Sequence, residues 1–213
     1  MTVSDIPLLE EATKTPFDLA MTEPFLSEEI CGSAFQNVSV TGARYVYMLQ
    51  NHTIPSLAGK HQLEDKLKRM LDPKEFSKVH LIIAGGYDDR VRENTEHYEE
   101  LQSHVQNFYL GESVSFLKSP SDDAKRVLFH SCTAVLYTPS NEHFGIVPLE
   151  AMLLGRPVLA CSSGGPLETV LHEQTGFLCD ATPEFFASKM ALLTRDRSLA
   201  RELGNAASEH VKR

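Results

Sequence analysis

Two glutamates in the stretch SNEHFGIVPLEAM, residues 140–152, are spaced so that both could contact one ligand. Glu142 precedes Gly145, and Glu150 follows that glycine by five residues. A helix that begins near Gly145 would present the free N–H groups of its first turn, and the positive end of its dipole, to an anion such as phosphate. Pro148 is compatible with this helix because a first-turn N–H has no helical partner.

Carboxylates at these two positions would also suit a sugar. A carboxylate accepts two hydroxyl hydrogen bonds, and a vicinal diol of a ribose or hexose offers two hydroxyls. Glu142 would stand in the loop before the helix, and Glu150 would lie over a turn further in. The spacing alone leaves an alternative open, in which Glu142 is a solvated loop residue and Glu150 is a surface charge of the helix.

The surrounding elements indicate how these glutamates are positioned. From about residue 61 onward, apolar runs that predict strands alternate with stretches that predict helices. The predicted strands lie in VHLIIAGG (79–86), SVSFL (113–117), CTAVLYTPS (132–140), RPVLACSSGG (156–165) and GFLCD (176–180). Such an alternation predicts an α/β fold, a Rossmann-like doubly wound parallel sheet covered on both faces. Helix starts are predicted after Ser121, at Thr182-Pro183 and at Asp196.

Three of the predicted strands end in unusual loops. One ends at Gly85-Gly86, one runs into the polar loop before Gly145, and one ends at Gly164-Gly165. Ligands of an open parallel sheet bind beyond the carboxyl ends of its strands, so the three loops would open on the binding edge. Each glycine pair alone could be a plain turn, but three together predict a ligand site. No GxGxxG is present, so the dinucleotide fingerprint of dehydrogenases is missing.

Composition excludes several function classes. The chain has 213 residues, with 20 Lys and Arg against 29 Asp and Glu, and no basic stripe, so we expect no nucleic-acid partner. The four cysteines are far apart and form no CxxC pair, which predicts neither disulfides nor a metal site. The N-terminus does not resemble a signal peptide, and no run of about 18 apolar residues predicts a transmembrane segment.

The chain divides into two regions of different character. Residues 1–60 contain four prolines and an irregular pattern of unassigned role, in which only Val38–Leu49 alternates enough to predict a strand. Residues 61–213 are predicted to form one Rossmann-like domain that carries the predicted ligand site.

Several motifs together resemble a known family. The Glu142-x7-Glu150 spacing is followed by Gly155-x-Pro157, SGGPLE (163–168) and TGFL (175–178). Their order and spacing resemble the C-terminal donor domain of the GT-B, family 4 retaining glycosyltransferases, also called glycosyl transferases group 1. The stretch HLIIAGGYDDRVRENTEHYEELQ (80–102), with LYTPSNEHFGIVPLEAM, is most similar to the α-mannosyltransferases of that family that extend the dolichol-linked oligosaccharide. The resemblance covers about residues 76–213.

This resemblance implies a donor, GDP-mannose, and a role for each matching residue. Glu150 would hold the ribose hydroxyls, and Glu142 would lie by the donor sugar as the catalytic residue. The amides of Phe144, Gly145, Ile146 and Val147 would lie near the diphosphate or the sugar. The nucleobase would lie near Gly85, Gly86 and the loop 116–119, which includes Phe116 and Lys118. The family needs no metal or other cofactor, because the helix dipole and basic side chains neutralise the leaving diphosphate.

The resemblance also implies partners, a location and two departures. The acceptor would be a dolichol-linked oligosaccharide at the cytosolic face of the endoplasmic reticulum, with scope for peripheral membrane association. Family members carry an Arg and a Lys after the first strand of this domain, but Lys60, Lys66 and Lys68 are more simply interpreted as a solvated helix face. Residues 1–60 are too few for the N-terminal acceptor domain, which we expect to be missing. The alternative function is a non-catalytic module that binds a nucleotide sugar or a partner.

Overall fold

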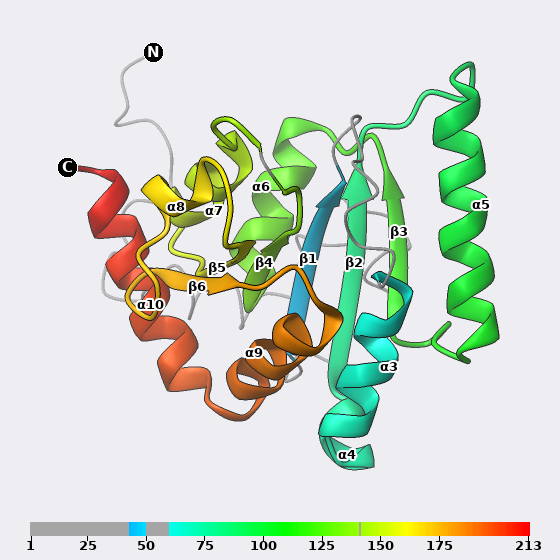
Figure 1. Cartoon of the computed structure of the whole chain (residues 1–213), viewed down its shortest axis with the longest axis horizontal. Helices are drawn as coiled ribbons and strands as arrows, with labels where there is room; N and C mark the ends of the chain where they lie inside the picture. Colours follow the sequence, from blue (N-terminus) through cyan, green and yellow to red (C-terminus); the bar gives the residue numbers. More distant parts are fainter. Residues whose placement is uncertain (1–42, 50–59, 141) are drawn as a thin grey trace, which may run out of the picture.

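A computed structural model describes residues 43–49, 60–140 and 142–213. Its centre is a six-stranded sheet in the order β3-β2-β1-β4-β5-β6 (Figure 1), and every strand pairing in it is parallel. The strands are β1 (Ala43–Leu49), β2 (Val79–Gly85), β3 (Val114–Lys118), β4 (Ala134–Tyr137), β5 (Val158–Cys161) and β6 (Gly176–Cys179). The predicted parallel sheet is therefore confirmed.

Helices connect the strands, as the alternating pattern predicts. They are α3 (Lys60–Met70), α4 (Pro73–Phe76), α5 (Arg92–Asn107), α6 (Asp122–Ser131), α7 (Ile146–Leu153), α8 (Pro166–Thr169), α9 (Pro183–Arg195) and α10 (Arg197–Val211). Ser121, Thr182 and Asp196 are the N-caps of α6, α9 and α10, and each side chain accepts a hydrogen bond from a first-turn N–H. These three predicted helix starts are confirmed.

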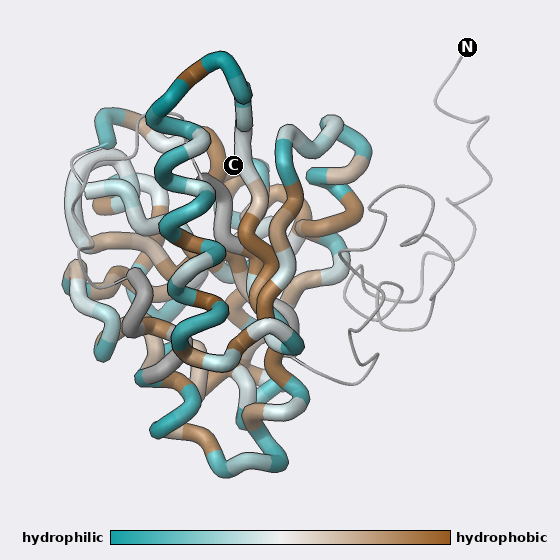
Figure 2. The backbone as a smooth tube through the Cα atoms, turned by 90° about the vertical axis from the view of Figure 1, so that its right-hand side faces the viewer, coloured by the Kyte–Doolittle hydropathy of each residue, from teal (hydrophilic) through white to brown (hydrophobic). Residues whose placement is uncertain are grey.

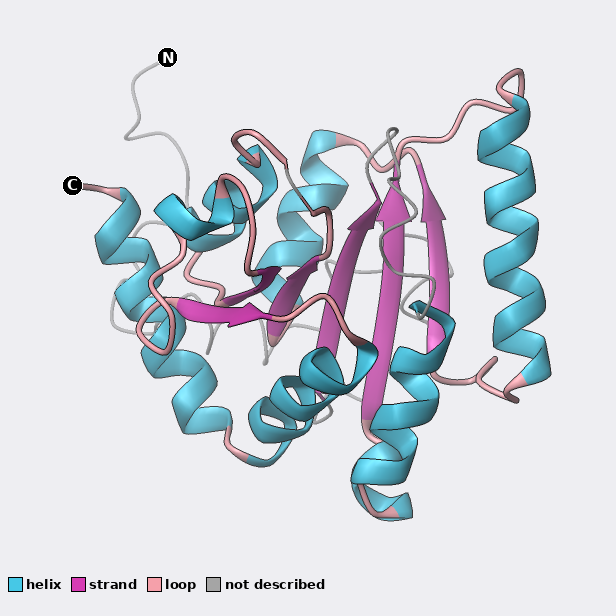
Figure 3. Ribbon diagram, in the orientation of Figure 1, coloured by secondary structure: helices cyan, strands magenta, loops and turns pink. Residues whose placement is uncertain are grey.

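Helices cover both faces of the sheet (Figure 3), because successive side chains of each strand point to opposite faces. Tyr45 packs in one core cluster with residues of α3 and α9, while its neighbour Val46 packs in the other with residues of α6 and α7. The last helix, α10, contributes to both clusters. The fold is thus doubly wound, as predicted.

Strand β1 occupies the middle of the sheet, between β2 and β4. The sheet therefore includes residues upstream of the predicted domain start at residue 61, and the predicted strand within Val38–Leu49 is confirmed over residues 43–49. The chain order of the strands reverses beside β1: β2 and β3 lie on one side, and β4, β5 and β6 on the other. Ligands of doubly wound sheets bind at such a switch point, beyond the carboxyl ends of the strands. The remainder of the predicted region 1–60 lies outside the described residues, apart from Lys60.

Helix α5 is attached more lightly than its neighbours. Figure 2 shows it facing the viewer as a mostly hydrophilic segment, and Leu101 is its one buried residue. Half-buried Val105 adds to this contact by packing against the core cluster of α3 and α9. Most of the α5 surface is therefore solvated.

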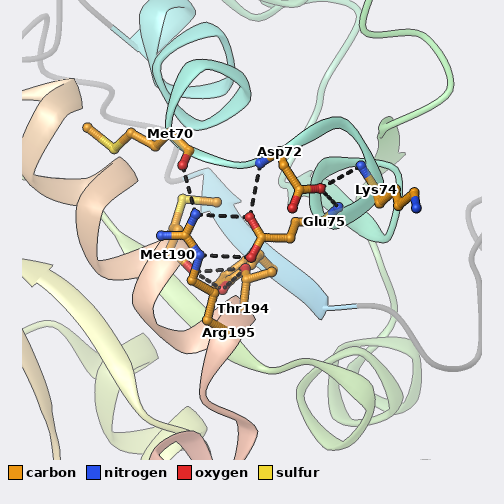
Figure 4. A network of polar contacts seen from close by, with 8 residues as sticks. Met70, Asp72, Lys74, Glu75, Met190, Thr194 and Arg195 are labelled. Carbon is orange, nitrogen blue, oxygen red and sulfur yellow. Dashed lines mark hydrogen bonds and ion pairs between the residues drawn. The ribbon is translucent and has the colours of Figure 1, made fainter.

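Ion pairs join α3 and α4 to α9 near the amino end of β2. Arg195 makes a bidentate pair with Glu75, at 2.8 and 2.9 Å, and also donates to the carbonyl of Met70 (Figure 4). Asp72 caps α4, and its own N–H donates to Glu75 Oε2 at 3.0 Å. Beneath this network, the buried hydroxyl of Tyr45 in β1 donates to the carbonyl of Met190 in α9. These contacts fix α9 over the central strand.

Candidate functional site

The loop from β4 to α7 carries both glutamates, and Gly145 determines how it enters the helix. Gly145 is the N-cap of α7 with φ of 74°, in the left-handed region that favours glycine. A Cβ at this position would also lie 3.0 Å from the hydroxyl oxygen of Tyr137. Because glycine has no side chain, α7 lacks the side-chain cap that α6, α9 and α10 possess. The N–H groups of its first turn have no partner within the helix.

Glu142 lies in this loop, half-buried, and its backbone is held by the neighbouring loop. Its carboxylate accepts a hydrogen bond from the N–H of His143 at 3.1 Å. Its carbonyl accepts one from the N–H of Gly165 at 2.7 Å. The carboxylate has no cationic partner among the described residues.

The loop from β5 to α8 packs directly on the loop that carries Glu142. A Cβ on Gly164 would lie 2.2 Å from the carbonyl oxygen of Glu142, and one on Gly165 would lie 2.3 Å from that of Phe144. Real Cβ atoms essentially never approach a carbonyl oxygen so closely. The two glycines therefore position the glutamate loop by backbone contact, and they do not face it across an open space as the opposite wall of the site.

Glu150 has an uneven set of contacts. Its Oε1 accepts a hydrogen bond from Nζ of Lys125 in α6 at 2.8 Å. Its Oε2 is buried and has no hydrogen-bond partner among the described residues. An unpartnered buried polar atom costs about 1–3 kcal/mol, and more when it is charged. A plain surface charge of the helix does not fit this environment.

The residues predicted to lie near a nucleobase gather at the ends of β2 and β3. Gly85 pairs with Lys118 in the sheet, and its carbonyl accepts from the N–H of Ser119 at 2.7 Å. The hydroxyl of Ser119 also bridges the backbone N–H and carbonyl of Tyr87. Gly86, which lies between Gly85 and Tyr87 in the sequence, is exposed.

The side chains of Phe116 and Lys118 turn from this edge toward α5. Lys118 Nζ lies 3.8 Å from the ring centroid of Tyr87 and 3.7 Å from that of Tyr98. Phe116 meets Tyr98 edge-on, with ring centroids 5.3 Å apart. The backbone of Gly85 and Gly86 is therefore the part of the predicted nucleobase set that stays at this edge.

The two groups of predicted site residues share the carboxyl edge, but β1 lies between their strands. The sheet places β2 and β4 two strand spacings apart, about 10 Å. Residues 50–59, which follow β1 in the sequence, lie outside the described residues. Lys66, considered as a diphosphate ligand, pairs with Glu184 of α9 at 2.7 Å, which agrees with its interpretation as part of a helix face. The side chain of Lys60 lies outside the described residues.

Sequence reasoning missed Lys125. Its side chain is 25% exposed and reaches from α6 to α7, across 25 residues of sequence. The only available signal was its position in the first turns of the helix that follows β3. That signal does not distinguish it from Arg126, whose side chain is 71% exposed.

Metal-binding and membrane-spanning features were searched over the described residues. They contain no group of three or more His, Cys, Asp or Glu side chains that could hold a metal ion. The thiols of Cys132, Cys161 and Cys179 are free and buried, and burial raises the pKa of Cys179 to about 12. None of the described helices is long and apolar enough to cross a membrane.

The family described as Glycosyl transferases group 1 matches residues 54–210 of this chain. The chain belongs to this family. It is 53% identical over 147 residues to the human Alpha-1,3/1,6-mannosyltransferase ALG2. The matched residues make up 69% of this chain and 35% of that protein. The Dictyostelium discoideum protein of the same name is 40% identical over 138 residues, which make up 65% of this chain and 33% of that protein. The chain therefore spans about a third of the length of these relatives.

Solved structures share the fold. Anabaena Alr3699/HepE in complex with UDP matches with a TM-score of 0.68 and 25% identity, covering 81% of this chain and 44% of that one. The C-terminal domain of the Glycosyl Transferase Group 1 Family Protein LpcC from Francisella tularensis matches with a TM-score of 0.65 and 18% identity, covering 80% and 85%. The sheet and its helices thus have the architecture of the C-terminal domain of a GT-B glycosyltransferase.

Proposed function

We propose that this chain is the donor-binding half of an α-1,3/1,6-mannosyltransferase that binds GDP-mannose. One observation carries the proposal: Glu150, about one turn into a helix without a side-chain cap, has a buried carboxylate oxygen that lacks a partner among the described residues. In this family the matching glutamate holds the ribose of a nucleotide sugar. The 53% identity to a mannosyltransferase supports mannose as the transferred sugar.

Each part of the site has a role in this proposal. The ribose hydroxyls donate to Glu150, which lies deeper along α7. The first-turn amides of Gly145, Ile146 and Val147, with that of Phe144, receive the diphosphate or sugar oxygens. Glu142, at the start of the loop, lies by the mannosyl group. The nucleobase lies along the backbone of Gly85 and Gly86, since Phe116 and Lys118 support this edge from the side of α5.

The chemistry asked of these residues is electrostatic. Negative charge grows on the diphosphate as the bond to the mannosyl carbon breaks, and oriented N–H groups at the start of α7 stabilise that charge without reorganising. Pro148 restricts the first turn, so the amides before it keep their direction.

The proposed acceptor is a dolichol-linked oligosaccharide, which places the protein at the cytosolic face of the endoplasmic reticulum as a peripheral component. Retaining transfer requires the donor and the acceptor to be held together, and the described residues form the donor-type domain. That observation favours a second candidate function, in which the chain binds a nucleotide sugar without transferring it.

Calorimetry on the purified chain tests the proposal. We expect GDP and GDP-mannose to bind at one site, and UDP to bind more weakly. Glu142→Ala should leave the affinity for GDP nearly unchanged but impair recognition or transfer of the mannosyl group. A chain that binds neither GDP nor GDP-mannose would refute the proposed function. Binding without transfer to a lipid-linked acceptor would favour the second candidate.

A further inference from the structure

A cation on a neighbouring helix holds Glu150 in place. We propose that Lys125 is a positioning residue for the nucleotide site: it binds one oxygen of Glu150 and orients the carboxylate so that the other oxygen accepts from the ribose. This inference rests on the proposed function, because it concerns the same carboxylate.

The geometry distinguishes Lys125 from an ordinary surface lysine. Its side chain is 25% exposed and that of Glu150 is 33% exposed, and the distance from Nζ to Oε1 is 2.8 Å. The contact joins α6, which follows β3, to α7, which follows β4. Its sequence neighbour Arg126 is exposed and pairs only loosely with Asp123 of its own helix, at 3.8 Å. Of these two adjacent cations, Lys125 is therefore the one that contacts Glu150.

The effect on Glu150 follows from how its two oxygens are used. A carboxylate has about four acceptor sites, and Lys125 uses one of them on Oε1. Oε2 is buried and has no partner among the described residues, so it gains more from a new donor than an oxygen that water already solvates. The terminal torsion of a glutamate is broad, so a small rotation brings Oε2 to a ribose hydroxyl while Lys125 keeps its hold on the carboxylate.

Lys125 thus favours nucleotide binding by orienting Glu150. The contact reduces the number of side-chain conformations that binding must restrict. This effect acts through Glu150 and does not require Lys125 to touch the nucleotide.

Lys125→Met keeps most of the aliphatic stem and removes the charge. We expect it to weaken GDP binding by roughly tenfold, the loss of one charge-assisted contact. Lys125→Arg should restore most of the affinity. Arg126→Met, the matched control on the same helix, should bind GDP as the parent does. Thermal unfolding of each variant shows whether the fold is kept, since a partly exposed ion pair contributes little to stability.

A double-mutant cycle tests whether Lys125 acts through Glu150. In a Glu150→Ala background, Lys125→Met should cause no further loss of GDP affinity. The 2′,3′-dideoxy form of GDP, which lacks the hydroxyls that Glu150 would accept from, should bind the parent and Lys125→Met alike.

The outcomes separate this inference from the proposed function. If the parent binds GDP and Lys125→Met binds it equally or more tightly, the positioning role is wrong while the donor site stands. A tenfold loss that persists in the Glu150→Ala background would instead mean that Lys125 contacts the nucleotide itself, which also overturns the inference. A parent chain that binds no GDP would overturn both.

Discussion

Glu75 and Glu150 are two carboxylates that each pair with one cation, and their remaining contacts differ. Glu75 accepts from Arg195 through both oxygens, and Oε2 receives a further hydrogen bond from the N–H of Asp72. Glu150 accepts from Lys125 through Oε1, while Oε2 is buried without a partner among the described residues. The first carboxylate is satisfied by the protein, and the second is not.

We therefore interpret the contacts of Glu75 as structural and Glu150 as part of a binding site. Hydrogen bonds from Arg195 and Asp72 hold the pKa of Glu75 at about 2, well below the ordinary value for a glutamate. This network fastens α4 to α9 near the amino end of β2 (Figure 4). Glu150 lies in α7, which follows the opposite, carboxyl end of β4, where a ligand can supply the donor that the described residues omit.

The largest expected effect concerns the contact between the loops that follow β4 and β5, which positions the proposed ligand site. Gly165→Ala would bring a Cβ to 2.3 Å from the carbonyl oxygen of Phe144, so the loops of β4 and β5 must separate. We expect a loss of about 3 kcal/mol in the free energy of unfolding, measured with urea. Gly111→Ala is the control, because a Cβ there meets nothing within 4 Å. Equal stability of the two variants would contradict the backbone contact.

The next effect distinguishes the two carboxylates by ligand affinity. Glu150→Ala removes the proposed ribose acceptor, so GDP should bind about ten- to a hundredfold more weakly, or roughly 1.5–3 kcal/mol. Glu75→Ala should leave the GDP dissociation constant unchanged, as calorimetry can establish. Similar GDP affinities for both variants and the parent would remove the basis of the comparison.

The smallest effect is a pH dependence that belongs to Glu75. Because its pKa is lower in the folded protein than in the unfolded chain, its pairing stabilises the fold above about pH 4.5 and ceases to do so as the pH falls toward 2. Urea midpoints measured between about pH 6 and pH 3 should therefore decline. Arg195→Met should reduce the slope of that decline. An unchanged slope in this variant would show that other groups carry the acid sensitivity.

Local signals in the sequence were sufficient for most of the fold. Ser121, Thr182 and Asp196 cap helices where predicted, because a cap depends on residues within one turn. The apolar runs predicted the five strands from β2 to β6, because strands covered on both faces need continuous apolar sequence. The alternating pattern predicted a helix that begins near Gly145, and α7 has that residue as its N-cap.

Features that depend on distant residues could not be predicted. The central place of β1 requires partners in β2 and β4, which lie far along the chain. Lys125 meets Glu150 only because α6 and α7 pack on the same face of the sheet. The close contact of Gly164 with Glu142 is likewise a contact between two loops, so the glycine pair looked like an ordinary turn.

A crystal structure of the chain with GDP would test the central claim most directly. We predict a ribose hydroxyl within about 2.6–3.2 Å of a Glu150 oxygen, the diphosphate at the N–H groups that begin α7, and Lys125 still bound to the other oxygen. The contacts of Glu75 should be unchanged. A nucleotide bound away from Glu150, with Oε2 still lacking a partner, would contradict the account.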